Sequence, residues 1–179
     1  MEGLLFIAEG KALKIFILDT SAIIGGFTPS MSTAEILTVK EVLEEARATL
    51  TKLKMEAAIA SEKIKIREPS PESLNRVEEE VRKTGDRLST TDIRLLALAL
   101  DHREDGMLLT DDYAIQNIAV SLGIRFRSVV MKGIKARFIW RGYCVACKKW
   151  YLPTKRECEV CGSKLLRKPR RVSFYKKEV

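Results

Sequence analysis

The sequence has one histidine, and it has no cysteine before residue 144. With His102 alone, a catalytic pair of histidines is excluded; its position near a helix end favours a structural role, because a cation there interacts with the helix dipole. Neither a G-x-S-x-G motif nor a G-x-x-x-x-G-K-[ST] phosphate loop is present. The chain therefore lacks the usual parts of serine hydrolases, cysteine hydrolases and P-loop nucleotide hydrolases.

Long apolar runs are also missing. No stretch approaches the roughly 18–20 consecutive apolar residues that a membrane span needs, and the run at residues 4–8 is too short for the core of a signal peptide. We therefore expect a cytoplasmic protein without membrane contact. In that compartment paired cysteines bind metal more often than they form disulfides.

The two ends of the chain differ in charge. Residues 1–130 carry 17 Lys and Arg against 21 Asp and Glu, whereas residues 131–179 carry 15 against 3. A basic module beside an acidic one suggests that one part holds a polyanion and the other acts on it. We expect a domain over 1–130, a linker or connecting strand over 131–139, a zinc ribbon over 140–166 and a basic tail over 167–179.

Apolar periodicity predicts strands that alternate with helices. Strands are expected at 13–18, 64–66, 107–110 and 124–130. Helices are expected at 70–85, 89–101 and 112–122, and 38–61 is one long helix or two abutting ones. This alternation predicts a parallel-sheet α/β/α sandwich. Residues 1–12 are either an extra edge strand or a disordered leader, and the loop opening at Asp19-Thr20-Ser21 follows the first buried strand.

Five carboxylates recur where strands end or helices begin, and each has an ordinary structural explanation. Asp19, Asp111 and Asp112 follow apolar strands, so each can close a turn or cap a helix. Thr38-x-x-Glu41 and Ser89-x-x-Asp92 both fit a capping box, in which the acid accepts a backbone N–H. Taken singly, these residues favour structure over function.

Taken together, the same carboxylates favour a metal site. Open parallel sheets bind ligands beyond the carboxyl ends of their strands, where the helices also begin. Four or five acids meeting there repel one another unless divalent cations lie between them. Mg²⁺ or Mn²⁺ in that place activates water for attack on a phosphodiester.

Cys144, Cys147, Cys158 and Cys161 have the spacing C-x2-C-x10-C-x2-C, which predicts one structural zinc ion. Aromatic and basic residues alternate around them, and 7 of the 12 aromatic residues lie beyond residue 130. Rings that do not form the ribbon's core can stack on unpaired bases, and we expect Trp150 or Tyr151 to be core. The tail is either a solvated, flexible end or an RNA contact. The expected RNA-binding residues are Arg141, Lys148, Lys149, Arg167, Lys168, Arg170 and Arg171.

These motifs, in this order and spacing, resemble the PIN-domain ribonucleases, and the fused four-cysteine ribbon is similar to the archaeal Nob family. The resemblance implies a parallel α/β sandwich, Mn²⁺ or Mg²⁺ dependence, and cleavage of precursor small-subunit rRNA at its mature 3′ end, within a pre-ribosomal particle. It also implies that Asp19, Glu41, Asp92 and one of Asp111 and Asp112 hold the metals. The pattern Thr-x-Asp at the last position favours Asp112.

Two other functions compete with this interpretation. A general RNA-decay nuclease with an appended ribbon would cut mixed RNAs at dispersed positions. A non-catalytic RNA-binding factor for ribosome assembly would use its carboxylates only to cap helices. A nuclease acting on DNA is less favoured, although basic charge and stacking do not distinguish the two sugars.

Overall fold

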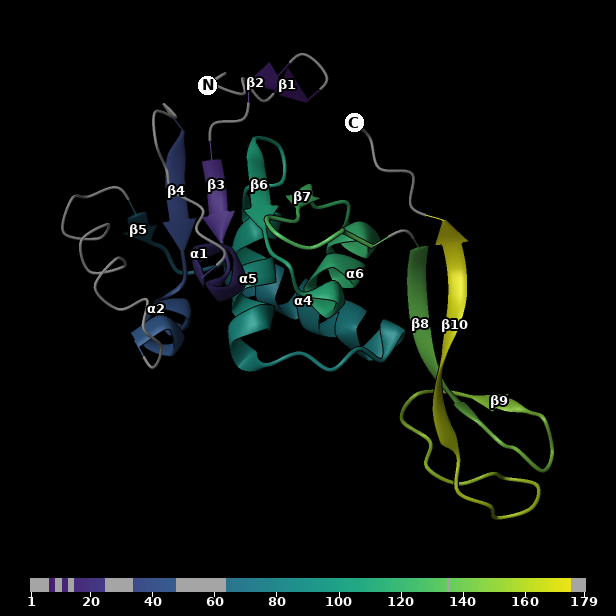
Figure 1. The fold of residues 1–179 in the computed structure, drawn as a ribbon. Helices are drawn as coiled ribbons and strands as arrows, with labels where there is room; N and C mark the ends of the chain where they lie inside the picture. Colours follow the sequence, from purple (N-terminus) through teal and green to yellow (C-terminus); the bar gives the residue numbers. More distant parts are fainter. Residues whose placement is uncertain are drawn as a thin grey trace.

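The computed structural model describes residues 7–8, 11–12, 15–24, 34–47, 64–134 and 136–174 (Figure 1). Its larger sheet has five strands that all run parallel. Across the sheet their order is β5 (Ile64–Ile66), β4 (Glu35–Thr38), β3 (Ile15–Leu18), β6 (Gly106–Leu109) and β7 (Phe126–Arg127). The prediction of a parallel α/β fold is confirmed.

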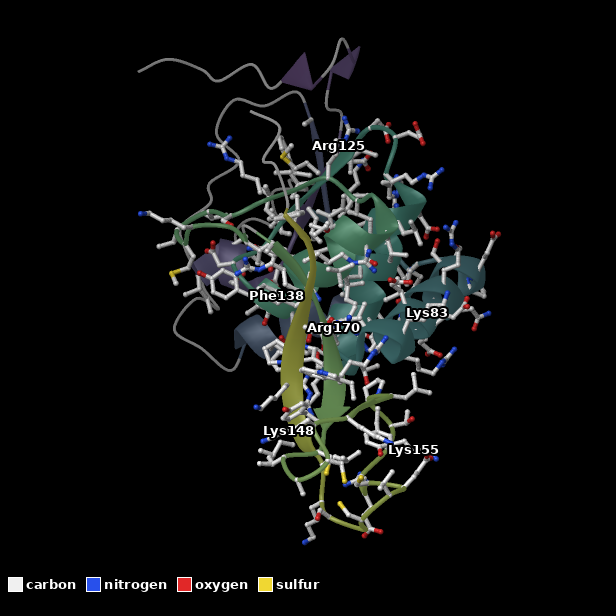
Figure 2. All side chains as sticks on the ribbon, turned by 90° about the vertical axis from the view of Figure 1, so that its right-hand side faces the viewer. Lys83, Arg125, Phe138, Lys148, Lys155 and Arg170 are labelled. Atoms are coloured by element: carbon white, nitrogen blue, oxygen red, sulfur yellow. The ribbon has the colours of Figure 1, made fainter. Side chains whose placement is uncertain are left out.

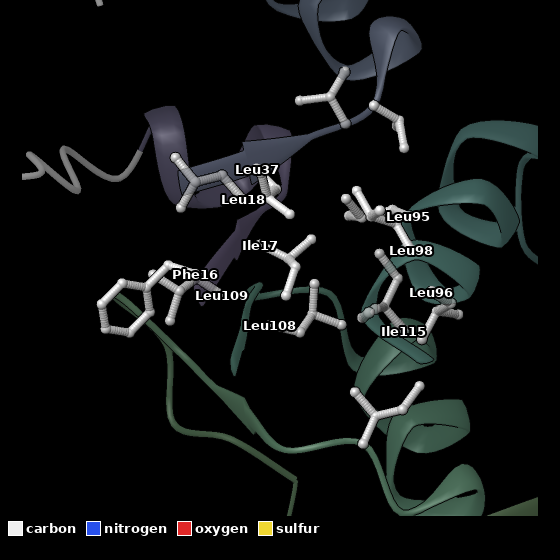
Figure 3. Close-up of a cluster of buried hydrophobic side chains, with 14 of the residues drawn as sticks. Phe16, Ile17, Leu18, Leu37, Leu95, Leu96, Leu98, Leu108, Leu109 and Ile115 are labelled. Carbon is white, nitrogen blue, oxygen red and sulfur yellow. The ribbon is translucent and has the colours of Figure 1, made fainter. Parts of the chain in front are cut away.

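Strand β3 lies at the centre of the sheet, and all four of its residues are buried. Figure 3 shows Ile17 and Leu108 on the side of α5 (Thr90–Asp101), whereas Phe16 lies on the opposite side. Burial on both faces explains why the sequence here is a continuous apolar run and does not alternate with polar residues.

Three helices begin and end where the sequence predicts, because their caps are local. Ser70 caps α4 (Pro71–Thr84), and Gly85 ends it in a left-handed conformation with φ of 74°. Ser89 caps α5, and α6 (Tyr113–Leu122) ends at Gly123. No helix within the described ranges has the length and apolar character needed to cross a membrane.

The segment before α2 (Lys40–Arg47) corrects the sequence analysis. Residues 35–38 form strand β4, which was not expected, and the Thr38 hydroxyl donates to the Leu18 carbonyl oxygen at 2.8 Å. Thr38 and Glu41 therefore do not form the capping box that their spacing suggested. The expected continuation of the helix over 48–61 lies outside the described residues.

Two further differences concern short elements. Thr20–Ile24 form helix α1 where a loop was expected, and β7 is two residues long where a strand over 124–130 was expected. The β7 strand stops because the backbone N–H groups of residues 129–131 donate to the Asp111 carboxylate. Near the N-terminus, β1 (Ile7–Ala8) pairs with β2 (Lys11–Ala12) in a separate two-stranded antiparallel sheet, so neither strand is an edge strand of the larger sheet.

The C-terminal part forms an antiparallel sheet in the order β10 (Leu166–Phe174), β8 (Ala136–Tyr143) and β9 (Trp150–Tyr151). Residues 136–139 of the expected linker therefore belong to β8, and residues 167–174 of the expected tail belong to β10. The β8–β10 hairpin extends from beside α6 away from the larger domain toward β9 (Figure 1), and Cys144 directly follows β8. Trp150 is 42% exposed and so is not a core residue, whereas Tyr151 is half-buried.

Candidate active site and cysteine centre

Asp19 lies at the carboxyl end of β3, next to the end of β6, where the chain's connections turn to opposite sides of the sheet. The residue is 7% exposed, and its Oδ1 accepts the Thr20 N–H at 2.7 Å. Its Oδ2 accepts the Ser21 hydroxyl at 2.6 Å and the Thr110 hydroxyl at 2.7 Å. Three donors therefore fix the orientation of this carboxylate.

Thr110 connects Asp19 to the acids that follow β6. Its fully buried hydroxyl donates to Asp19 and accepts the N–H of Asp112 at 3.0 Å. Ser21 acts in the same way, since its oxygen donates to Asp19 and accepts the Asp111 N–H at 3.0 Å. Both hydroxyl residues lie within the sequence motifs, but the motifs predict no role for them.

Asp92 lies in the first turn of α5, in the capping box that was predicted. Its Oδ2 accepts the Ser89 N–H at 2.8 Å, and its own N–H donates to the Ser89 hydroxyl at 3.1 Å. Burial raises the pKa of Asp92 above that of an ordinary aspartate, and the negative charges of Asp112 and Asp19 raise it further. Three carboxylates brought together by separate elements thus repel one another at this edge of the sheet.

Asp111 and Asp112 are adjacent in sequence but differ in their partners. Asp112 caps α6 through Oδ1, which accepts the N–H groups of Ala114 at 2.6 Å and Ile115 at 3.0 Å. Its Oδ2 accepts no hydrogen bond from the part of the chain that the structure describes. The Asp111 carboxylate instead accepts the three backbone N–H groups of residues 129–131, at 3.0–3.2 Å.

Glu41 lies in the first turn of α2, beside Arg94 of α5. The Arg94 Nε is 2.7 Å from Glu41 Oε1, an ion pair without the alignment of a hydrogen bond. Arg94 also pairs with Glu68, and Glu41 Oε2 is buried without a hydrogen-bond partner among the described groups. The sequence does not indicate that Arg94 pairs with Glu41, because an arginine two residues after Asp92 is not a specific motif.

These carboxylates offer the oxygen ligands that Mg²⁺ and Mn²⁺ prefer. The mutual repulsion at Asp92 and the unpartnered Glu41 oxygen are both features that a divalent cation relieves. In their donor types these residues therefore suit such an ion. Thr110 links Asp19 to Asp112, the charges of both act on Asp92, and Glu41 is joined through Arg94 to the helix that carries Asp92.

The four cysteines form a preassembled metal centre, with their sulfur atoms within 4.8 Å of one another. Two equivalent turns bring them together: the Lys148 N–H donates to the Cys144 carbonyl at 2.9 Å, and the Gly162 N–H donates to that of Cys158 at 2.8 Å. Lys148 and Gly162 both have positive φ, 57° and 70°. In Figure 2 the sulfur atoms gather at the end of the hairpin farthest from the larger domain.

The basic residues divide into two groups. Arg167 lies over the Trp140 ring at 3.6 Å and donates to the Gly85 carbonyl at 2.8 Å, and Arg141 donates to the Lys83 carbonyl at 3.1 Å. These two arginines therefore hold the hairpin against the end of α4. The other expected RNA-binding residues are exposed: Lys148, Lys149, Lys168, Arg170 and Arg171.

A buried polar network joins the hairpin to the larger domain. Asp86 accepts the indole N–H of Trp140 at 3.0 Å through Oδ1 and the Asn117 amide at 2.7 Å through Oδ2. The Asn117 side chain also exchanges two hydrogen bonds with the backbone of Phe138, at 2.8 and 2.9 Å. The hairpin thus contacts the loop that leads to Ser89 and the helix that begins after Asp112. No sequence pattern indicated these contacts.

Comparison with known proteins adds three relatives and one family match. A family described as "PIN domain of ribonuclease" matches residues 16–101. The chain is similar to Endoribonuclease Nob1 of Methanocaldococcus jannaschii, with 45% identity over 87% of this chain and 78% of that protein. It is also similar to Endoribonuclease Nob1 of Methanothermobacter thermautotrophicus, with 41% identity over 87% and 93%. Ribonuclease VapC1 of Thermoplasma acidophilum is 34% identical over 86% and 77%.

Proposed function

This chain belongs to the Nob1 family of PIN-domain endoribonucleases, and from that membership we propose that it cleaves precursor small-subunit rRNA at the mature 3′ end. The observation that carries the catalytic part is that Thr110 links Asp19 to Asp112 at the carboxyl edge of the sheet and that the charges of both act on Asp92. A non-catalytic protein needs no such convergence, because each cap functions alone.

Asp19, Asp92 and Asp112 would hold Mn²⁺ or Mg²⁺, with Glu41 at the margin of the site. The bound ion would activate water and stabilise the leaving oxygen of the phosphodiester. Asp111 belongs to the same cluster, and its bonds to residues 129–131 favour a supporting role over a direct ligand role.

The chain's own side chains prepare this site before any ion arrives. Ser21 and Thr110 fix the Asp19 carboxylate, and the capping box fixes Asp92. Arg94 holds Glu41 beside α5. Such preorganised ligands lower the cost of reaching the reactive arrangement.

We assign zinc to the cysteine centre. Four sulfur ligands in a tetrahedron at about 2.3 Å from zinc would lie about 3.8 Å apart, and the Cys144 and Cys161 sulfurs are 3.6 Å apart. A ribbon of this size buries too little apolar area to fold without such a bond. The domain limits 1–130, 131–139, 140–166 and 167–179 remain part of this proposal, with β8 running across the second boundary and β10 across the third.

Replacing Tyr151 by phenylalanine is expected to weaken zinc binding by roughly 10–100-fold, the usual cost of losing a partner of a metal ligand. The Tyr151 hydroxyl lies 3.1 Å from Cys158 Sγ and is the main cause that lowers the pKa of that thiol to about 6. Competition with a chromophoric chelator measures the affinity. Tyr143→Phe is the matched control, because it removes a hydroxyl that contacts no sulfur among the described residues; equal affinities for both variants would contradict the assignment.

The RNA part of the proposal rests on the exposed cations of the ribbon and β10. Lys148, Lys149, Lys168, Arg170 and Arg171 are expected to contact phosphates, so binding should weaken steeply as salt concentration rises. Arg141 and Arg167 are expected to act mainly by holding the hairpin in place.

The deciding experiment uses labelled RNA that spans the 3′ end of small-subunit rRNA, incubated with the purified chain and Mn²⁺ or Mg²⁺. We expect one metal-dependent cut at the mature end, with no cut in metal-free buffer. Dispersed cuts in this RNA and in unrelated RNAs would instead support an RNA-decay nuclease, which the likeness to Ribonuclease VapC1 keeps as a second candidate. Tight binding without cleavage would support a non-catalytic assembly factor.

A further inference from the structure

A cavity of about 830 Å³ lies between the β8–β10 hairpin and the N-terminal part of α6. We propose that it binds one unpaired nucleobase of the RNA next to the scissile phosphodiester, an inference that rests on the proposed function. Its walls combine aromatic rings with cations, and Tyr113, Phe138, Trp140, Arg87, Lys132 and Arg167 are the residues that matter here.

The aromatic walls are held in place before a ligand arrives. Phe138 and Trp140 lie two residues apart on β8 and so point to the same face of the hairpin. The Trp140 indole is fixed by Asp86 on its edge and by Arg167 over its ring. Tyr113 is different, since it is 50% exposed and lies at the rim. A rigid apolar wall facing an exposed ring suits the insertion of a flat base.

The charges around the cavity complement a nucleic acid. Arg87 and Lys132 are exposed cations of the lining, and the one acidic residue, Asp86, already binds Trp140 and Asn117. An aromatic pocket rimmed by cations is how proteins hold single-stranded RNA, with stacking for the base and cations for the phosphates. A base inside a duplex is already stacked, so the concave shape selects unpaired RNA.

The cavity is lined by sequence neighbours of the proposed catalytic acids. Tyr113 directly follows Asp112, and Arg87 comes two residues before Ser89, which caps the helix carrying Asp92. The rim is therefore built from the two segments that position these carboxylates. With a phosphodiester at the acids, a base of an adjacent nucleotide is the group placed to enter the cavity.

The test is a binding cycle that combines Tyr113→Ala with RNA lacking single bases. All proteins carry Asp19→Asn to prevent cleavage, and fluorescence anisotropy measures affinity for a short unpaired RNA in which one abasic nucleotide is moved along the sequence. An abasic nucleotide at one position, within two nucleotides of the cut, is expected to lower the affinity on the order of tenfold. Tyr113→Ala should cause a similar loss on intact RNA and abolish the sensitivity to that position.

Matched variants separate stacking from charge and from folding. Tyr113→Phe keeps the ring and should bind as tightly as the parent protein. Lys132→Ala should weaken binding to every RNA and reduce the slope of log affinity against log salt concentration by about one. Arg103 does not line the cavity, so Arg103→Ala should change neither quantity. Circular dichroism confirms that each variant is folded.

The proposal is overturned if Tyr113→Ala and each abasic position lower the RNA affinity independently, so that the two losses add at every position. It is also overturned if a fully paired duplex binds as tightly as the unpaired RNA. If either result is obtained while the wild-type chain cleaves RNA at one site, the cavity proposal alone fails. If the wild-type chain does not cleave RNA, the proposed function fails, and the binding cycle still reports whether a base enters the cavity.

Discussion

Asp112→Asn is expected to reduce the rate of RNA cleavage more than about a hundredfold, beyond the 10–100-fold typical of a residue that only supports a metal ligand. The fold should remain, because asparagine caps helices about as well as aspartate. Its Oδ1 can still accept the N–H groups of Ala114 and Ile115, while the second, negatively charged oxygen is lost. Single-turnover cleavage and thermal unfolding of the same preparation measure the two effects.

Asp111→Ala is the companion variant, and it is expected to lower stability more than it lowers the rate of cleavage. It removes the acceptor for three backbone N–H groups, a loss of about 2 kcal/mol in the free energy of unfolding, since bonds to charged acceptors contribute roughly 1.5–3 kcal/mol each when buried. Two of the three donors are on exposed residues, which keeps the loss modest. Cleavage below the unfolding temperature should fall far less than in Asp112→Asn. Comparable loss of cleavage in both variants would mean that both acids hold the ion.

Cys144→Ser is expected to remove zinc and unfold the ribbon while the parallel sheet stays folded. Structural zinc contributes roughly 10–16 kcal/mol in small cysteine sites, far more than the residual contacts of this module can replace. Cys144 is fully buried and its N–H donates to Lys149 at 3.0 Å, so its loss opens the first turn of the centre. RNA affinity should fall sharply, because the cations at residues 148–149 lose their fixed positions.

Amide hydrogen exchange separates the two halves in that experiment, and metal analysis gives the zinc content. Protection should vanish over residues 144–165 and persist in β3, β6 and α5. Val145→Ser, a change at a 50% exposed position in the same turn, is the control and should retain one zinc ion per chain. Loss of protection throughout the Cys144→Ser protein would show that the larger domain also depends on the metal.

The features that the sequence predicted correctly depend on neighbours along the chain. The cap at Ser70, the stop at Gly85 and the Ser89–Asp92 box each require residues within one helical turn, so spacing alone is informative. The four-cysteine centre was predicted for the same reason, since each turn is local. Strand β4 was missed because only two of its four residues, Ile36 and Leu37, are apolar, and because its last residue, Thr38, mimics a helix cap.

The features that were missed depend on residues far apart in the chain. The Asp86–Asn117 and Asp86–Trp140 bonds join positions 31 and 54 residues apart, and neither pair has a characteristic spacing. The charge pattern predicts a basic tail from residue 167, whereas residues 167–174 belong to β10 and pair with β8, which lies far away in the chain. The different partners of Asp111 and Asp112 depend on where β7 ends, which apolar pattern does not fix.

The junction at Asp86 limits how far the two halves of this chain can be treated as interchangeable parts. A chimera that grafts a foreign ribbon after residue 134 would remove Trp140 and the Phe138 backbone, and with them the partners of Asp86 and Asn117. A buried carboxylate would then lose a hydrogen bond that helps to hold it in place. Ribbon exchange between relatives should succeed only when the donor's α4–α5 loop and α6 are transplanted together with its hairpin.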